Sequence, residues 1–177
     1  MRREGGLGPP LTFGIIGTLL GGLIGALYQV MLSASVGGLV DPSEMREQMF
    51  VTAFSSGCVI VVLPLVAVLS IFIGSAVYHV LLMLLGAARR PFETTMRVVA
   101  YAMGATSLLQ VVPVCGAVIA AVWAIVANII GLAQSHEIST GKAAAAVLIP
   151  ILVCCVVSVL FYAAIFALIM GRIMTQS

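Results

Sequence analysis

The chain has 177 residues, of which 62% are hydrophobic and 8% are charged, and its formal net charge is +2. A soluble domain carries about a quarter charged residues because its surface faces water, so this composition excludes a water-soluble globule. Lipid can cover an apolar surface instead, and we expect an all-α, polytopic integral membrane bundle. The Lys and Arg residues are scattered in ones and twos, which argues against a nucleic-acid partner.

The first predicted elements are a short cytoplasmic N-terminus, residues 1–10, and a membrane span over residues 11–34. The apolar run is too long for a signal peptide and lacks a cleavage site, so we expect it to be retained. Gly17, Gly21 and Gly25 share one face of this helix and would let another backbone approach closely. The partner could be another helix of the same chain or a second copy.

The second predicted span covers residues 50–88 and is long enough for two spans of about 20 residues each. No charge or turn interrupts it, so we expect one unusually long helix that kinks near Pro64. Asp41, Pro42 and Glu44 have the pattern of a helix start, which places the beginning of the helix before it enters lipid.

The remaining predicted spans are 92–112, 114–134 and 143–171, which makes five in all. With a cytoplasmic N-terminus, five spans put six of the eight Lys and Arg residues inside and two outside, as the positive-inside rule expects. Dividing the second span would reverse this balance to three inside and five outside. The inner six are Arg2, Arg3, Arg89, Arg90, Arg97 and Lys142, and the outer two are Arg46 and Arg172.

Glu93, Arg97 and Tyr101 lie four residues apart at the start of the third predicted span and share one helical face. Glu before Arg at this spacing is the favourable order for an ion pair. The group could anchor the helix at the interface. Together with Arg89 and Arg90, it could instead form a basic patch that binds anionic lipid headgroups or a partner.

Three polar residues lie deeper, His79, Tyr101 and Asn128, and all are predicted to fall in the cytoplasmic half of the membrane. Polar side chains there are costly unless they have partners, so we expect at least two of them to hydrogen-bond each other or nearby Ser and Thr. They could link helices or line a pathway for protons or a solute.

Enzyme signatures are absent from the sequence: it has no paired carboxylates within a span, no phosphate-binding glycine loop and no nucleophile elbow. We therefore expect no enzymatic activity, no cofactor and no metal. His136 and Glu137 are the one His–acid neighbour pair, and adjacent helical residues face apart. The candidate functional contacts are His79, Glu93, Arg97, Tyr101, Asn128, His136 and Lys142.

Three stretches between about residues 60 and 152 resemble the Yip-one domain family, the Ypt/Rab-interacting membrane proteins and their prokaryotic relatives. A single departure is Gly86-Ala87, where the family commonly has two glycines. The stretches are residues 79–86 with Phe92, Thr95 and 97–101; Pro113, Gly116, Ile119 and Trp123; and Gly131, Leu132, His136, Ser139, Lys142 and Ala143.

The resemblance implies five spans, and in eukaryotes it implies a link to Rab GTPases and vesicle formation. The short chain looks like a prokaryotic-type member in the cytoplasmic membrane, for which no Rab partner is implied. We expect a non-enzymatic scaffold, adaptor or trafficking-type assembly factor that acts through lipid and helix contacts, including self-association. The alternative is a small transporter or channel that uses the half-buried polar residues.

Overall fold

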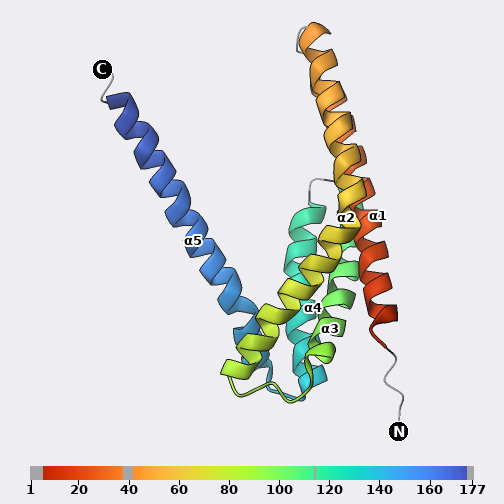
Figure 1. The fold of residues 1–177 in the computed structure, drawn as a ribbon, viewed down its shortest axis with the longest axis vertical. Helices are drawn as coiled ribbons and strands as arrows, with labels where there is room; N and C mark the ends of the chain where they lie inside the picture. Colours follow the sequence, from red (N-terminus) through yellow and green to blue (C-terminus); the bar gives the residue numbers. More distant parts are fainter. Residues whose placement is uncertain (1–5, 38–41, 114, 175–177) are drawn as a thin grey trace.

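The computed structural model describes residues 6–37, 42–113 and 115–174, and these residues form helices without any strand (Figure 1). This confirms the predicted all-α bundle. The helices alternate in direction, so α1, α3 and α5 begin at the end where α2 and α4 finish. We call this the near end and the opposite one the far end. The helices are α1 (Gly8–Gly37), α2 (Pro42–Leu84), α3 (Phe92–Ser107), the 3₁₀ helix η1 (Leu108–Val111), α4 (Gly116–His136) and α5 (Thr140–Met174).

Within the described residues, four helices are long and apolar enough to cross a membrane, one fewer than the sequence predicts. They comprise Gly8–Leu32, Val61–Leu84, Gly116–His136 and Thr140–Arg172. The predicted third span differs because α3 has 16 residues and then tightens into the 4 residues of η1. At about 1.5 Å per α-helical residue and 2.0 Å per 3₁₀ residue, the two together reach about 32 Å, close to the hydrocarbon thickness of about 30 Å.

The central position in the bundle belongs to α3, which packs against α1, α2 and α4. Ile71, Met96 and Ala100 form a buried cluster where α2 meets α3, and Leu7 and Leu11 from the start of the chain pack against it. Because neighbouring helices cover α3, it can carry more polar side chains than a lipid-facing span.

The glycine face of α1 lies against α3 of the same chain. A Cβ atom at Gly17 would overlap the backbone of Gly104, and one at Gly21 would lie 2.5 Å from the carbonyl oxygen of Ser107. Gly25 has only an ordinary contact, with Gln110, 3.7 Å from its ideal Cβ position. Two of the three glycines therefore allow the close backbone approach that the sequence pattern predicts, and the partner is within the chain.

The prediction of one long second helix is confirmed, because α2 is continuous for 43 residues. It changes direction in the segment that contains Pro64 (Figure 1), where proline removes a helical hydrogen bond. Its described start is Pro42, while Asp41 lies outside the described residues. It ends at Leu84, earlier than predicted, because Gly86 adopts a φ of 60° and donates its N–H to Met83 in a helix-ending turn.

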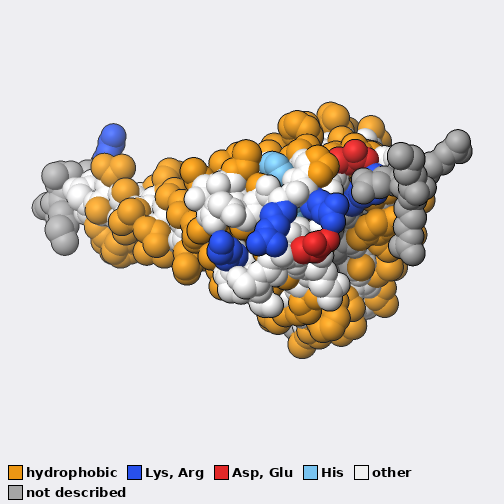
Figure 2. Space-filling view, turned by 90° about the horizontal axis from the view of Figure 1, so that it is seen from below, with side chains coloured by type: hydrophobic (Ala, Val, Ile, Leu, Met, Phe, Trp, Pro, Cys, Tyr) orange, Lys and Arg blue, Asp and Glu red, His pale blue; other side chains and the backbone are white. Residues whose placement is uncertain are grey.

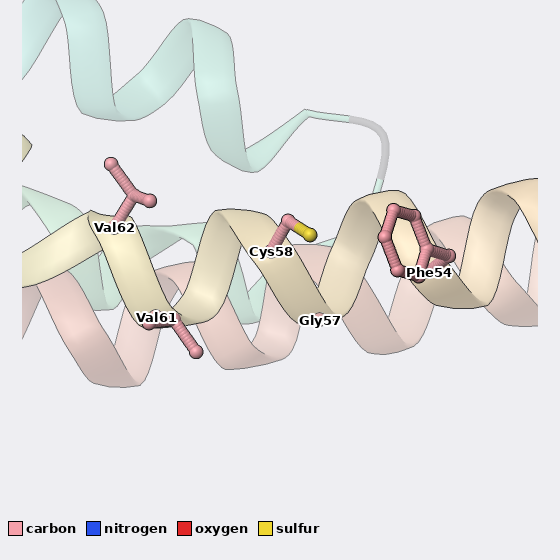
Figure 3. A pocket seen from close by; sticks show the side chains of 5 residues that line it. All are labelled: Phe54, Gly57, Cys58, Val61 and Val62. Carbon is pink, nitrogen blue, oxygen red and sulfur yellow. The ribbon is translucent and has the colours of Figure 1, made fainter.

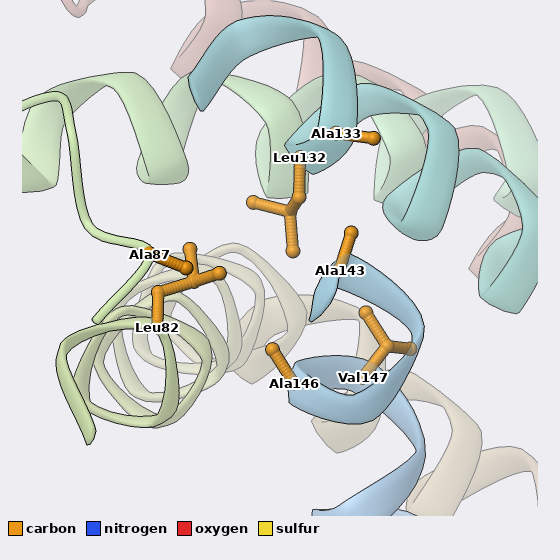
Figure 4. Close-up of a cluster of buried hydrophobic side chains, with 7 residues drawn as sticks. All are labelled: Leu82, Ala87, Leu132, Ala133, Ala143, Ala146 and Val147. Atoms are coloured by element: carbon orange, nitrogen blue, oxygen red, sulfur yellow. The ribbon is translucent and has the colours of Figure 1, made fainter. Parts of the chain in front are cut away.

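The first turns of α5 close the near end of the bundle. They pack against the ends of α2 and α4, and Figure 4 shows the side chains of this cluster pointing toward one another. Residues 152–172 are all exposed, and beyond Cys155, the last residue that lines a hollow with α2, the helix separates from the bundle (Figure 1). The buried cluster comprises Leu82, Ala87, Leu132, Ala133, Ala143, Ala146 and Val147.

Three of the described helices, α1, α2 and α5, are clearly longer than the hydrocarbon core of a bilayer is thick. The 21 residues of α4 span about 32 Å, whereas the 43 of α2 and the 35 of α5 span about 65 and 52 Å. Gly22 of α1 packs against Leu63 of α2, and the Tyr28 hydroxyl donates to the carbonyl of Val111 at the end of η1. Because α1 and α2 are antiparallel, α2 before about residue 57 lies beyond η1.

This projecting part of α2 begins with mostly polar residues and then exposes large apolar side chains, although the last turns of α1 run beside it. Phe50, Val51 and Phe54 are 73%, 63% and 66% exposed. Figure 3 shows an adjoining shallow hollow, and all five of its lining residues belong to α2. The lining residues are Phe54, Gly57, Cys58, Val61 and Val62.

The first prediction concerns the close contact of α1 with α3. We expect Gly17→Ala to lower the free energy of unfolding by about 1–3 kcal/mol, the usual cost of overpacking. Gly57→Ala is the matched control, since nothing lies within 4 Å of its Cβ position and alanine favours helix. Thermal unfolding in one detergent measures both variants. Equal stability of the two would contradict the backbone contact.

Candidate functional site

A chain of hydrogen bonds at the near end joins two histidines through Thr95. His79 Nδ1 lies 2.9 Å from Thr95 Oγ1, and Thr95 Oγ1 lies 3.0 Å from His136 Nε2. The backbone N–H of Arg90 donates to His136 Nδ1 at 3.3 Å. The three side chains come from three helices, and the two imidazole centroids are 6.0 Å apart. We call His79, Thr95 and His136 the His–Thr–His chain.

The helix directions place these residues together. His136 is the last residue of α4, His79 lies just over a turn before the end of α2, and Thr95 lies in the first turn of α3. Since α2 and α4 finish where α3 begins, all three meet at one level. Thr95 and His136 are completely buried.

The donors and acceptors of the His–Thr–His chain form one consistent sequence. Because the Arg90 N–H is a donor, His136 Nδ1 must accept, and a neutral His136 then carries its proton on Nε2. His136 Nε2 can donate to Thr95 Oγ1, whose hydroxyl proton is then free to reach His79 Nδ1. The His–Thr–His chain therefore gives both imidazoles hydrogen-bond partners without placing a charge inside the bundle.

Two arginines tie the loop between α2 and α3 to the end of α4. Arg90 Nη2 lies 2.6 Å from the Glu137 carboxylate, and Arg89 Nη1 donates to the Glu137 carbonyl at 2.9 Å. Glu137 has a φ of 54°, a conformation that is uncommon outside glycine. Its carboxylate and its carbonyl each bind one arginine, which gives a physical reason for a charged residue at this position.

The other predicted charged residues also gather at the near end. Glu93 and Arg97 form an ion pair of 2.6 Å within α3, and Lys142 is exposed in the first turn of α5. Arg97 Nε is buried and has no hydrogen-bond partner in the described ranges. Figure 2 views this end and shows Lys and Arg side chains side by side, with acidic side chains next to them and hydrophobic ones around.

The structure does not bring Tyr101 and Asn128 to His79, contrary to the expected polar set. Tyr101 is 47% exposed and its ring lies 5.5 Å from that of Phe13 in α1. Asn128 is buried and donates through Nδ2 to Ala124 of its own helix, while Oδ1 has no partner in the described part of the chain. Of the three, only His79 has a Ser or Thr partner, the hydroxyl of Thr95.

Sequence reasoning missed the central role of Thr95 and the meeting of the two histidines. His136 drew attention through its neighbour Glu137, yet the two side chains separate: one is buried and the other binds Arg90 in solvent. Their positions in the sequence could have predicted this meeting. His79 and His136 both lie close to the ends of helices, and helices that alternate in direction place those two ends on the same side of the bundle.

The chemistry of this site is that of a neutral polar link between helices. In the described ranges, no three His, Cys, Asp or Glu side chains are grouped so that they could hold a metal ion. The imidazoles and the hydroxyl bind each other, and the nearby carboxylates of Glu93 and Glu137 bind arginines.

These features together define a polytopic α-helical membrane protein whose polar contacts concentrate at one end. The Yip1 domain matches residues 1–162, and the chain belongs to that family. The match begins at residue 1, so it also covers α1 and the first half of α2, outside the region of about 60–152 on which the sequence resemblance rests. Searches of curated proteins and of solved structures each found no match.

The second prediction tests the His–Thr–His chain. Thr95→Val removes the hydroxyl and leaves buried imidazole nitrogens without a partner, at about 1–3 kcal/mol for each unsatisfied group. We expect unfolding in detergent at a clearly lower temperature, and recovery in Thr95→Ser.

Thr94→Val is the matched control for this experiment. It is the same substitution one residue earlier on a half-buried side of α3. A Thr95→Val protein as stable as Thr94→Val would show that the hydroxyl link contributes nothing.

Proposed function

We propose that the protein is a non-enzymatic membrane adaptor, a scaffold or trafficking-type assembly factor that binds other membrane-spanning helices. One observation carries this proposal. The helices α2 and α5 extend farther than the thickness of one bilayer, and both expose apolar side chains that no described part of the chain covers. Membership of the Yip1 domain family supports a role in the membrane.

The projecting part of α2 supplies the energetic reason. If residues 42–56 continue past the bilayer, their apolar side chains meet water unless a partner covers them. Full burial of a side chain such as Phe50 or Phe54 stabilises by about 1.5–3 kcal/mol. A partner that packs here is therefore favoured by several such contributions.

The separated part of α5 provides a second surface of the same kind. It contains Ala163 and Ala167, four residues apart on one face, and both are exposed. Small residues at this spacing let another helix approach closely, which is the main source of helix packing in lipid. The occupant that fits is an apolar membrane-spanning helix of another membrane protein.

We infer that the near end lies on the cytoplasmic side of a cell membrane. The support is the positive-inside rule, because the near end carries Arg89, Arg90, Arg97 and Lys142 in the described residues. The start of α1 lies at the same end (Figure 1).

A second candidate is movement of protons or a solute, and the His–Thr–His chain is the observation in its favour. The His–Thr–His chain extends no farther from the near end than His79. Farther along α3, the buried side chains that follow are apolar, at Met96, Val99 and Ala100. Flux into liposomes that Thr95→Val abolished and Thr94→Val left unchanged would favour transport over the adaptor role.

The third prediction tests the uncovered surfaces by photo-crosslinking in native membranes. A photoreactive residue at Phe54 or at Leu160 should give protein adducts of discrete mass, because both positions are uncovered. Val122 is the matched control, since it is 58% exposed on α4, whose length equals one bilayer.

The outcomes separate the alternatives. One adduct mass shared by Phe54 and Leu160 and absent at Val122 supports a partner. A mass of twice the chain identifies a second copy. Lipid adducts alone at all three positions would refute the adaptor proposal.

The fourth prediction tests the orientation with single cysteines. Cys115 as the sole cysteine lies at the far end, and Ser139→Cys in a chain without the four native cysteines lies at the near end. We expect an impermeant thiol reagent added outside intact cells to label Cys115 and not Ser139→Cys. Labelling with the opposite preference would invert the topology.

A further inference from the structure

We propose that the near end holds a binding site for an anionic phospholipid. Arg89 and Lys142 bind its phosphate, and the groove between α2 and α5 holds its acyl chain.

The charge balance leaves two cations available. Each described carboxylate at this end is already paired, Glu93 with Arg97 and Glu137 with Arg90. Arg89 and Lys142 are exposed, and neither forms an ion pair with another described residue. Two positive charges therefore remain for a ligand.

The two cations belong to one small region of the structure. Ala87, two residues before Arg89, packs in the same buried cluster as Ala143, which directly follows Lys142 (Figure 4). Arg89 is held by the bond from Nη1 to the Glu137 carbonyl, which leaves other donors of its guanidinium free. A phosphate between the two side chains would receive charge-assisted hydrogen bonds from both.

The backbone adds a smaller contribution of the same sign. Three helices, α1, α3 and α5, begin at the near end, and two, α2 and α4, finish there. Each terminus is equivalent to about half an elementary charge, positive at a start and negative at a finish. The sum is about half a positive charge, so the dipoles do not cancel the side-chain charges.

The apolar groove identifies the anion as a lipid and not a free phosphate. It lies between α2 and α5, two turns into the bundle from Lys142, and its lining is entirely apolar. A ligand that satisfies both the groove and the cations must carry an acyl chain and a negative headgroup on one molecule. The lining residues are Ala76, Val77, Val80, Leu81, Ile149, Pro150 and Val153.

The test measures thermal unfolding of the full chain in a nonionic detergent during titration with phosphatidylglycerol, phosphatidylcholine or glycerol 3-phosphate. We expect a saturable rise in unfolding temperature with phosphatidylglycerol alone, weakened by added salt. The double variant Arg89→Gln with Lys142→Gln should bind about 25-fold more weakly, from about fivefold for each charge removed.

Two further variants make the result specific. Arg89→Lys with Lys142→Arg keeps both charges and should retain tight binding. Arg46→Gln removes a charge from α2 at the far end and should behave as the unmodified protein does.

Three results would overturn the proposal. Phosphatidylcholine could stabilise as well as phosphatidylglycerol, which would show that the headgroup charge is not recognised. The double variant could keep its affinity, which would place the site elsewhere. Glycerol 3-phosphate could act at the same concentration as the lipid, which would show an anion site independent of the membrane.

Discussion

Backbone packs directly on backbone where Gly17 of α1 lies against Gly104 of α3. In lipid, no hydrophobic force drives helices together, so packing depends on short distances over a long interface. Glycine on both sides shortens that distance, and Phe13 then fills the space beside Gly104. Fixing α1 on α3 also positions α2, because Gly22 of α1 receives the side chain of Leu63.

The polar site depends on this arrangement because it needs α3 to be enclosed. Thr95 can reach His79 and His136 together only because α2 and α4 both pack on α3 and both finish near its start. Arg89 and Arg90 then bind the loop to the end of α4 through backbone and side-chain contacts with Glu137. The loop and three helix ends thus form one connected network.

Features that arise within one helix or from composition were predictable from the sequence. The membrane bundle follows from the scarcity of charge, the length of α2 from an uninterrupted apolar run, and the Glu93–Arg97 pair from i, i+4 spacing. The outline of the near end was also within reach, because charge asymmetry groups Arg89, Arg90 and Lys142.

Features that depend on the rotation of one helix against another were not predictable. Thr95 and Tyr101 are six residues apart, which turns them about 240° from each other, so α3 directs one to the histidines and the other toward Phe13. Nothing in the apolar run of α5 distinguishes a helix packed in the bundle throughout from one that leaves it partway along. The short third helix was missed for a related reason, since burial at the centre relaxes its need for apolar residues.

The length of α4 determines on which side of the membrane the apolar excess lies. With the charged near end at one interface, 21 residues bring α4 to the other interface near Gly116. An upright α5 reaches that level at about residue 161, and a tilted one a few residues later. Phe161 and Tyr162 are 63% and 70% exposed there, as an interfacial aromatic pair would be.

With the near end at one interface, the projecting part of α2 and the last turns of α5 would both extend beyond the other, on the side opposite the proposed lipid. The two proposed sites share α5, which lines the groove and continues into the separated part. An acyl chain between α2 and α5 would fix the angle at which α5 leaves the bundle, and that angle sets the separation of the two far surfaces. Lipid bound at the near end would then favour one separation of the far surfaces, and by reciprocity a partner that fits that separation would favour lipid binding.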